Sequence, residues 1–177
     1  MRKVLFSLAV AIVVSFAAHA QSGTIKIGIG GEAALPTGDA ADMVKTGVGG
    51  SAKALFGIGS AGQITFTTGY NTFSGKNLPK GDKATLSMIP FMAGYRQNFG
   101  GFYVEPHAGI GLMKAKETYE GESKTNSATR FTWAAGIGYV ISNVDLGIRY
   151  QSYESDGGHF DFAGVRLAYN IPVHGKK

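Results

Sequence analysis

Apolar and polar residues alternate with a period of two over most of the chain. Every second residue from 102 to 112 reads Phe, Val, Pro, Ala, Ile, Leu, whereas the residues between them read Tyr, Glu, His, Gly, Gly. This alternation is typical of strands whose two faces meet different environments. It predicts eight strands, at about residues 24–35, 46–56, 61–73, 83–97, 102–115, 127–140, 144–154 and 160–171.

Two of the predicted strands change phase. Leu86 and Met88 are out of phase with the apolar residues that follow them, and Pro90 at the change predicts a β-bulge. Phe160 and Phe162 are likewise out of phase with the rest of the last strand.

The connections between the predicted strands alternate between long and short. In chain order they read PTGDAADMVK, GIGS, SGKNLPKGD, NFGG, KETYEGESKTN, ISN and SDGGH. In a transmembrane barrel the turns at one end are tight and the loops at the other end are longer, and an even strand count returns both termini to the tight end. We therefore predict an all-β fold, an eight-stranded antiparallel up-and-down transmembrane β-barrel.

In such a barrel the apolar row faces lipid and the polar row faces the lumen, which eight strands leave just wide enough to be filled by side chains. The predicted polar network of the lumen comprises Lys26, Glu32, Lys53, Arg96, Glu105, His107, Arg130, Asp145, Arg149 and Arg166. We expect cross-lumen ion pairs and no open pore. Ten aromatic residues near strand ends predict interfacial girdles: Tyr70, Phe73, Tyr95, Phe99, Phe102, Tyr103, Tyr139, Tyr150, Tyr153 and Tyr169.

Residues 1–20 have the pattern of a cleaved signal peptide. Arg2 and Lys3 precede an apolar run that ends in the small-residue motif Ala18-His19-Ala20. Residues 21–177 then form a single barrel domain. The formal net charge of +5 includes Arg2 and Lys3, so the remaining chain carries only +3, too little and too dispersed for nucleic-acid binding. The chain has 27 Gly and no Cys, so thiolate metal sites and disulfides are excluded.

Several short sequences resemble one family along nearly the whole chain. They are GIGG at 28–31, LP at 35–36, GD at 38–39, GY at 69–70, TF at 72–73, IP at 89–90, GYR at 94–96, FYV at 102–104, AGIGY at 135–139, DLG at 145–147, RY at 149–150 and GVRLAY at 164–169. The chain resembles the porin-family or outer-membrane β-barrel domain proteins of Gram-negative bacteria, and its GVRLAY sequence resembles their C-terminal insertion signal.

The resemblance implies a monomer in the outer membrane, inserted by the barrel-assembly machinery and in contact with outer-membrane lipids and lipopolysaccharide. It also implies a structural or interaction role, in envelope integrity, adhesion or lipopolysaccharide contact, and no enzymatic activity. Two alternatives stay open from the residues: an exported barrel that binds a small apolar ligand, and a barrel enzyme that modifies lipid.

Candidate chemistry is sparse. The sequence GIGGEA at 28–33 fits a dinucleotide-binding fingerprint, but Pro36 would stop the helix that such a site needs. His159 and Asp161 are residue types used in acyl transfer, without an evident nucleophile or oxyanion hole. Acidic loop residues could bridge lipopolysaccharide phosphates through divalent cations: Asp39, Asp42, Glu117, Glu120 and Glu122. We assign no catalytic residue, cofactor or metal.

Overall fold

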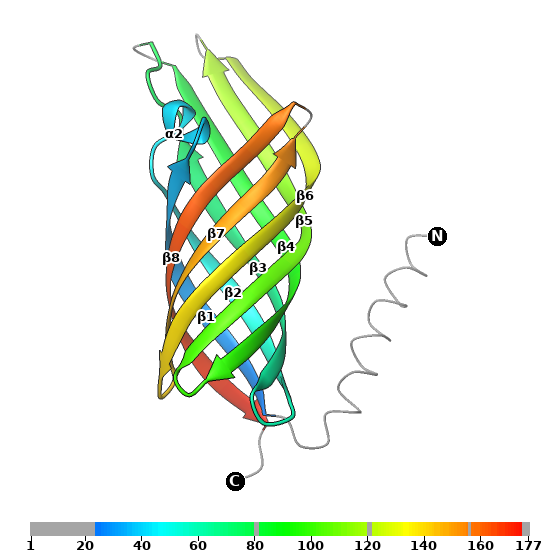
Figure 1. Ribbon diagram of the computed structural model, residues 1–177. Coiled ribbons are helices and arrows are strands. Elements are labelled where there is room, and N and C mark those ends of the chain that lie inside the picture. Colours follow the sequence, from blue (N-terminus) through cyan, green and yellow to red (C-terminus); the bar gives the residue numbers. More distant parts are fainter. Residues whose placement is uncertain (1–23, 80–81, 120–121, 156, 175–177) are drawn as a thin grey trace, which may run out of the picture.

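The protein forms a closed barrel of eight antiparallel strands, in which each strand pairs with the next and β8 pairs with β1 (Figure 1). The computed structural model describes residues 24–79, 82–119, 122–155 and 157–174, so the predicted signal peptide lies outside the described residues. The strands are β1 Ile25–Thr37, β2 Gly47–Ile58, β3 Gly62–Ser74, β4 Lys83–Phe99, β5 Phe102–Tyr119, β6 Glu122–Ile141, β7 Val144–Ser155 and β8 Gly158–His174. The predicted fold class is confirmed.

The two faces of the wall differ as the period of two requires. Large apolar side chains are exposed on the outer face of every strand, as at Ile29 on β1 and Leu146 on β7. Charged side chains on the alternate positions are buried inside, as at Glu32 and Asp145. A sheet can lie in the hydrocarbon core of a bilayer only if its exterior is apolar and all its strands are paired in a closed ring. No helix among the described residues is long and apolar enough to cross a membrane.

The two ends of the barrel differ in their connections. The start of β1, the end of β8 and the short turns at 59–61, 100–101 and 142–143 lie together, and we call this the turn end (Figure 1). Each of these turns contains one residue with positive φ, namely Gly59, Gly100 and Ser142, which lets the chain reverse within two or three residues. The opposite end, the loop end, carries the longer connections at 38–46 and 75–82.

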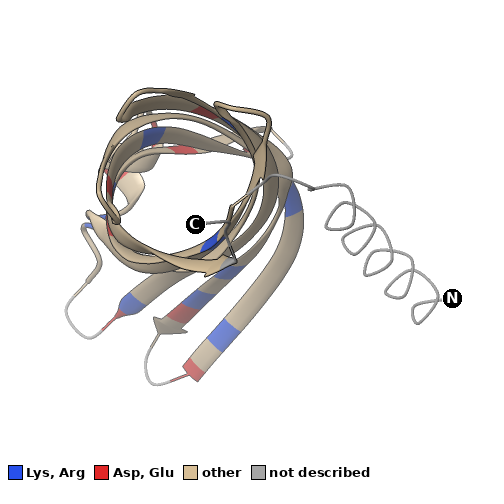
Figure 2. Cartoon of the chain, turned by 90° about the horizontal axis from the view of Figure 1, so that it is seen from below, with Lys and Arg blue, Asp and Glu red and all other residues tan. Residues whose placement is uncertain are grey.

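The segment KETYEGESKTN, which we predicted as a long loop, is mostly strand. β5 continues to Tyr119 and β6 begins at Glu122, with unbroken pairing from Phe102↔Tyr139 to Tyr119↔Glu122. Because β7 pairs with β6 only from Thr132 onward, this hairpin extends past β7 and β8 at the loop end (Figure 1). Figure 2 shows the closed ring from below, with blue and red charged positions on the strands that extend beyond it.

The predicted bulge at Pro90 is wrong. β4 pairs with β5 in one register on both sides of Pro90, and Leu86, Met88 and Pro90 all occupy inward positions. The inward phase is continuous because Leu86 and Met88 belong to an apolar cluster inside the barrel rather than to its lipid face. Phe162 on β8 is fully buried in the same cluster, which accounts for its apparent change of phase.

This cluster, the apolar layer, fills the lumen near the loop end. Its members are Ala34, Ala40, Val44, Phe73, Met88, Tyr153, Phe160 and Phe162, with Leu86 and Met113 packed against it. The ring centroids of Phe73 and Phe162 lie 5.6 Å apart. The short helix α2 (Ala40–Met43) covers the layer at the loop end (Figure 1). The ammonium of Lys76 donates a hydrogen bond to the carbonyl of Ala41.

Candidate functional site

A second layer, the charged layer, fills the lumen between the apolar layer and the turn end. One centre of it is Glu105 on β5, which is 2% exposed. Lys53 on β2 donates to its Oε2 at 2.6 Å, and Arg96 on β4 donates to the same oxygen at 2.9 Å. The Nε2 atom of His107 lies 3.0 Å from Oε1. A single carboxylate therefore links three strands across the barrel.

The other centre is Asp145 on β7, which is fully buried. Arg96 donates to its Oδ2 through Nη1 at 2.9 Å, so this guanidinium joins the two carboxylates. The hydroxyl of Tyr103 donates to Oδ1 at 2.7 Å, and Asn170 donates to Oδ2 at 3.3 Å. The Arg96 guanidinium also stacks over the Tyr103 ring, 3.6 Å from its centroid. These contacts satisfy both buried charges, without which burial would cost several kcal/mol.

Two further arginines complete the layer. Arg149 donates to Glu32 at 2.9 Å, across the barrel from β7 to β1. Arg166 donates to the Ser51 hydroxyl at 2.7 Å, and its Nη1 lies 3.9 Å from Asp145 Oδ2. The layer thus contains four Lys and Arg side chains in ion pairs with three carboxylates among the described residues.

The structure brings together eight of the ten residues that we predicted as a lumen network: Glu32, Lys53, Arg96, Glu105, His107, Asp145, Arg149 and Arg166. The other two lie apart from them. Lys26 occupies an inward position close to the turn end, and Arg130 an inward position on the hairpin side of Thr132. The cavity that remains in the charged layer measures about 20 Å³, room for roughly one water molecule.

Sequence reasoning misplaced three aromatic residues of the lumen. Tyr103, Phe73 and Tyr153 were predicted in the girdles, but they are 3%, 1% and 0% exposed and point inward. Strict use of the period of two would have placed Tyr103 with Glu105 and His107 on the inner row. Asn170 was also missed, and Ser51, although the alternation places it on the same inner row as Lys53, was left out of the predicted network.

Several inward glycines are needed for these contacts. A Cβ atom added to Gly138 would overlap the Tyr103 ring, and one added to Gly111 would overlap the Tyr153 ring. A Cβ added to Gly28 would lie 2.5 Å from the Asn170 side-chain oxygen. The glycine-rich sequence at 28–31 is thus part of the barrel wall, with Ile27 and Ile29 exposed on the outer face.

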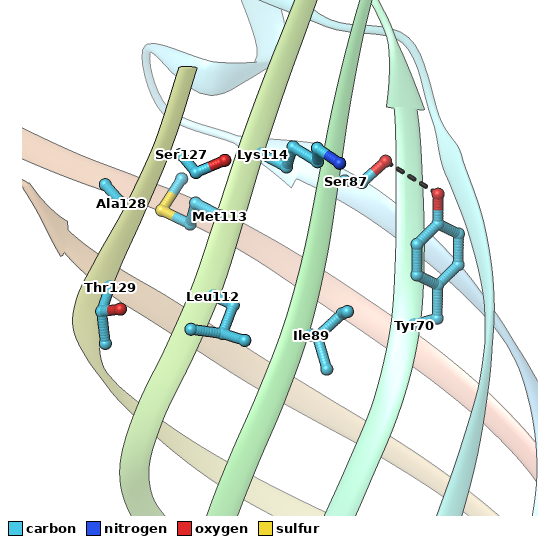
Figure 3. A pocket seen from close by; sticks show the side chains of 9 residues that line it. All are labelled: Tyr70, Ser87, Ile89, Leu112, Met113, Lys114, Ser127, Ala128 and Thr129. Atoms are coloured by element: carbon cyan, nitrogen blue, oxygen red, sulfur yellow. Dashed lines mark hydrogen bonds between the residues drawn. The ribbon is translucent and has the colours of Figure 1, made fainter. Parts of the chain in front are cut away.

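A separate feature lies on the outer face, a groove of about 490 Å³ across β3 to β6 toward the loop end (Figure 3). Outward residues that line it are Tyr70, Ser87, Ile89, Leu112, Lys114, Ser127 and Thr129. The hydroxyls of Tyr70 and Ser87 are hydrogen-bonded at 2.8 Å. In Figure 3 the Lys114 side chain extends from β5 over β4 toward this pair. The sequence analysis did not identify any residue of this groove as a binding residue.

The two residues proposed from the acyl-transfer pattern share the outer face of β8. His159 pairs with Glu154 of β7 and Asp161 pairs with Ser152, so they are two positions apart on one strand, about 7 Å. Groups of three or more His, Asp or Glu side chains that could hold a metal ion are absent from the described part of the chain.

Known structures share this barrel. Ail, the attachment invasion locus protein of Yersinia pestis, crystallised with the heparin analogue sucrose octasulfate, is 16% identical, with a TM-score of 0.67 over 85% of this chain and 100% of that chain. The N-terminal β-barrel domain of Pseudomonas aeruginosa OprF is 14% identical, with a TM-score of 0.60 over 85% and 100%. Neisserial surface protein A is 15% identical, with a TM-score of 0.57 over 84% and 96%.

At these identities the likeness shows the fold alone. No curated protein matches the chain. The model of the outer membrane protein beta-barrel domain family matches residues 6–170, nearly the whole sequence. The apolar outer face, the closed ring of eight strands and this match lead to one conclusion: the chain belongs to the outer membrane protein beta-barrel domain family.

Proposed function

We propose that the protein is a structural and interaction barrel of the outer membrane whose lumen is closed to ions and solutes. The observation that carries the proposal is the stacking of two filled layers inside one barrel. The charged layer joins six strands through the ion pairs of Glu32, Lys53, Arg96, Glu105, Asp145, Arg149 and Arg166. The apolar layer closes the lumen a second time beneath α2. With both layers occupied, the outer face and the loop end are the surfaces left for interaction.

Conductance in planar lipid bilayers tests this function. We expect the purified, folded protein to leave the bilayer current at its baseline, because side chains fill the lumen at both levels. A porin reconstituted in the same bilayer serves as the positive control. Stable, discrete channel currents from preparations that are fully folded by heat-modifiable gel mobility would overturn the proposal.

The proposal includes the arrangement of the chain in the envelope. Residues 1–20 are removed as a signal peptide, the barrel-assembly machinery inserts a monomer, and the turn end faces the periplasm. Cell fractionation and labelling of the loop end in whole cells check these statements. A cysteine introduced in place of exposed Lys45 should react with an impermeant maleimide, whereas one in place of exposed Ser142 should react only after lysis. The opposite pattern would reverse the orientation.

The proposal assigns no catalytic step to His159 and Asp161. Both are directed away from the lumen on one strand, and the residue across from His159 is Glu154, whereas acyl transfer would need a nucleophile within hydrogen-bond reach of the histidine. Replacing both, as His159→Gln and Asp161→Asn, should leave the lipid profile of the outer membrane unchanged. Loss of an acylated lipid species in this variant would instead support the lipid-modifying alternative.

A further inference from the structure

On the outer wall, the charged residues that the structure describes occupy a few positions near the loop end. On β4 and β5 they are Lys83, Lys114 and Lys116, all exposed and at alternate, outward positions. We call these three the lysine ladder. Within the described residues none of the three takes part in an ion pair, and no Asp or Glu shares the outer face of β3 to β6.

The acidic residues of the β5–β6 hairpin face the other way. Glu117 lies opposite Lys124 in the hairpin, and both point to the inner face, the same face as His107 and Ala134. The outward row instead carries hydroxyls next to the ladder. Ser87 and Ser127 flank Lys114, and Thr85 and Thr125 flank Lys116. One face of the hairpin is therefore purely cationic and hydroxylated, although the hairpin as a whole contains both signs of charge.

The ladder begins where the apolar wall ends. The row Phe91, Ile110 and Phe131 is exposed and apolar, at 49%, 51% and 47%. The next outward row contains Ile89 and Leu112, and the row after it contains Lys114. The surface changes from apolar to cationic between Ile110 and Lys114, four residues or about 13 Å along the strand. The 490 Å³ groove lies on this boundary, with Ile89 and Leu112 on its apolar side and Lys114 on its polar side (Figure 3).

A molecule that fits this boundary has an acyl part and an anionic part. Lys114 would meet a phosphate as a compact point charge, and the Ser127 hydroxyl together with the hydrogen-bonded pair Tyr70 and Ser87 would supply donors to its oxygens. Lys116 and Lys83 lie on the next two outward rows, so the ladder rises about 13 Å from its first member. This height exceeds the reach of a headgroup with one phosphate and suits a large, multiply phosphorylated saccharide headgroup.

We infer that the groove and the lysine ladder bind a phosphorylated glycolipid of the outer leaflet, with an acyl chain along Ile89 and Leu112 and phosphates at Lys114 and Lys116. The inference rests on the proposed function, because it needs the barrel in the outer membrane with its loop end outward. In the hypothesis from the sequence, acidic loop residues bind phosphates through divalent cations. In this inference the lysines contact the phosphates directly, so no divalent metal is needed at this face.

The test is the binding of fluorescently labelled lipid A to the folded protein in detergent micelles, measured by anisotropy. The double variant Lys114→Gln and Lys116→Gln should bind about 30-fold more weakly, since each lysine near an anionic lipid contributes roughly a factor of five. Lys124→Gln is the matched control, because it removes a lysine from the same hairpin on the opposite face. It should change the affinity less than twofold.

Two competition arms separate the sources of the phosphate. Unlabelled lipid A should displace the probe, whereas phosphatidylglycerol at the same concentration should not. Equal displacement by phosphatidylglycerol, or an equal loss of affinity in Lys124→Gln, would overturn the assignment by showing that any anionic lipid or the net charge suffices. Unchanged binding in the double variant would also overturn it. Bilayer conductance and heat-modifiable mobility of the same preparations report on the proposed function independently.

Discussion

The two layers of the lumen close the same barrel by different physical means. In the charged layer, Arg96 is 1% exposed and is held by Glu105 and Asp145 at 2.9 Å each. In the apolar layer, Phe73 and Phe162 are equally buried and contact their neighbours without polar atoms. The stability of the charged layer depends on matched charges, because a buried ion without a partner is costly. The stability of the apolar layer depends on filled volume, and apolar side chains of similar size can repack there.

This difference teaches that burial alone does not predict how a position in the barrel tolerates substitution. A change that keeps shape and removes charge should damage the charged layer, and a change that keeps apolarity and alters shape should be mild in the apolar layer. Only the Arg149 guanidinium, 5.9 Å from the Phe162 ring centroid, connects the two layers through a described ring contact. Substitutions in one layer should therefore add to those in the other, except at this junction.

The largest effect is expected from Asp145→Asn, which keeps the shape of the side chain and removes its charge. Arg96 and Arg166 would lose a buried carboxylate, and the free energy of unfolding should fall by about 3–5 kcal/mol. Urea unfolding of the barrel reconstituted in phospholipid vesicles measures it. Glu154→Gln is the matched control, since Glu154 is exposed on the same strand, and it should cost less than about 0.5 kcal/mol. Equal costs for the two variants would show that the pairing of Asp145 adds nothing.

A smaller effect is expected from Phe162→Leu in the apolar layer. Although Phe162 is 0% exposed, a leucine remains apolar and its neighbours can move toward it, so the cost should be about 1 kcal/mol. The same urea titration gives the value. The contrast between the layers fails if Phe162→Leu costs as much as Asp145→Asn, because shape would then limit both layers equally.

The sequence predicted the barrel well because a period of two marks each strand, and because the alternating long and short connections indicate a barrel with an even number of strands. It did not predict the hairpin at 116–126, where both faces are polar and no alternation in hydrophobicity exists. Backbone hydrogen bonds form the strands there without any apolar face. The sequence also misplaced three apolar residues, because apolar residues were expected to face lipid. These three face the lumen instead: Leu86, Met88 and Phe160.

The charged layer was predictable only as a set of residues. Membership of the inner row follows from alternation, which places Glu105 and Asp145 inside. The pairs that form depend on distances across the lumen between residues far apart in the chain, such as Arg149 and Glu32, separated by 117 positions. The outer groove was not predicted at all, because it arises from side chains on four strands whose register only the structure supplies.

The smallest expected effect is on conductance, where a double variant of the apolar layer should leave the bilayer current unchanged. Phe73→Ala combined with Phe162→Ala removes the two central rings of the apolar layer and should open space near the loop end. We expect the bilayer current to stay at its baseline, because the ion pairs of Arg96 with Glu105 and Asp145 still close the barrel closer to the turn end. Heat-modifiable mobility must show that the variant is folded. Channel currents from a folded double variant would mean that the apolar layer alone seals the lumen and that the charged layer leaks.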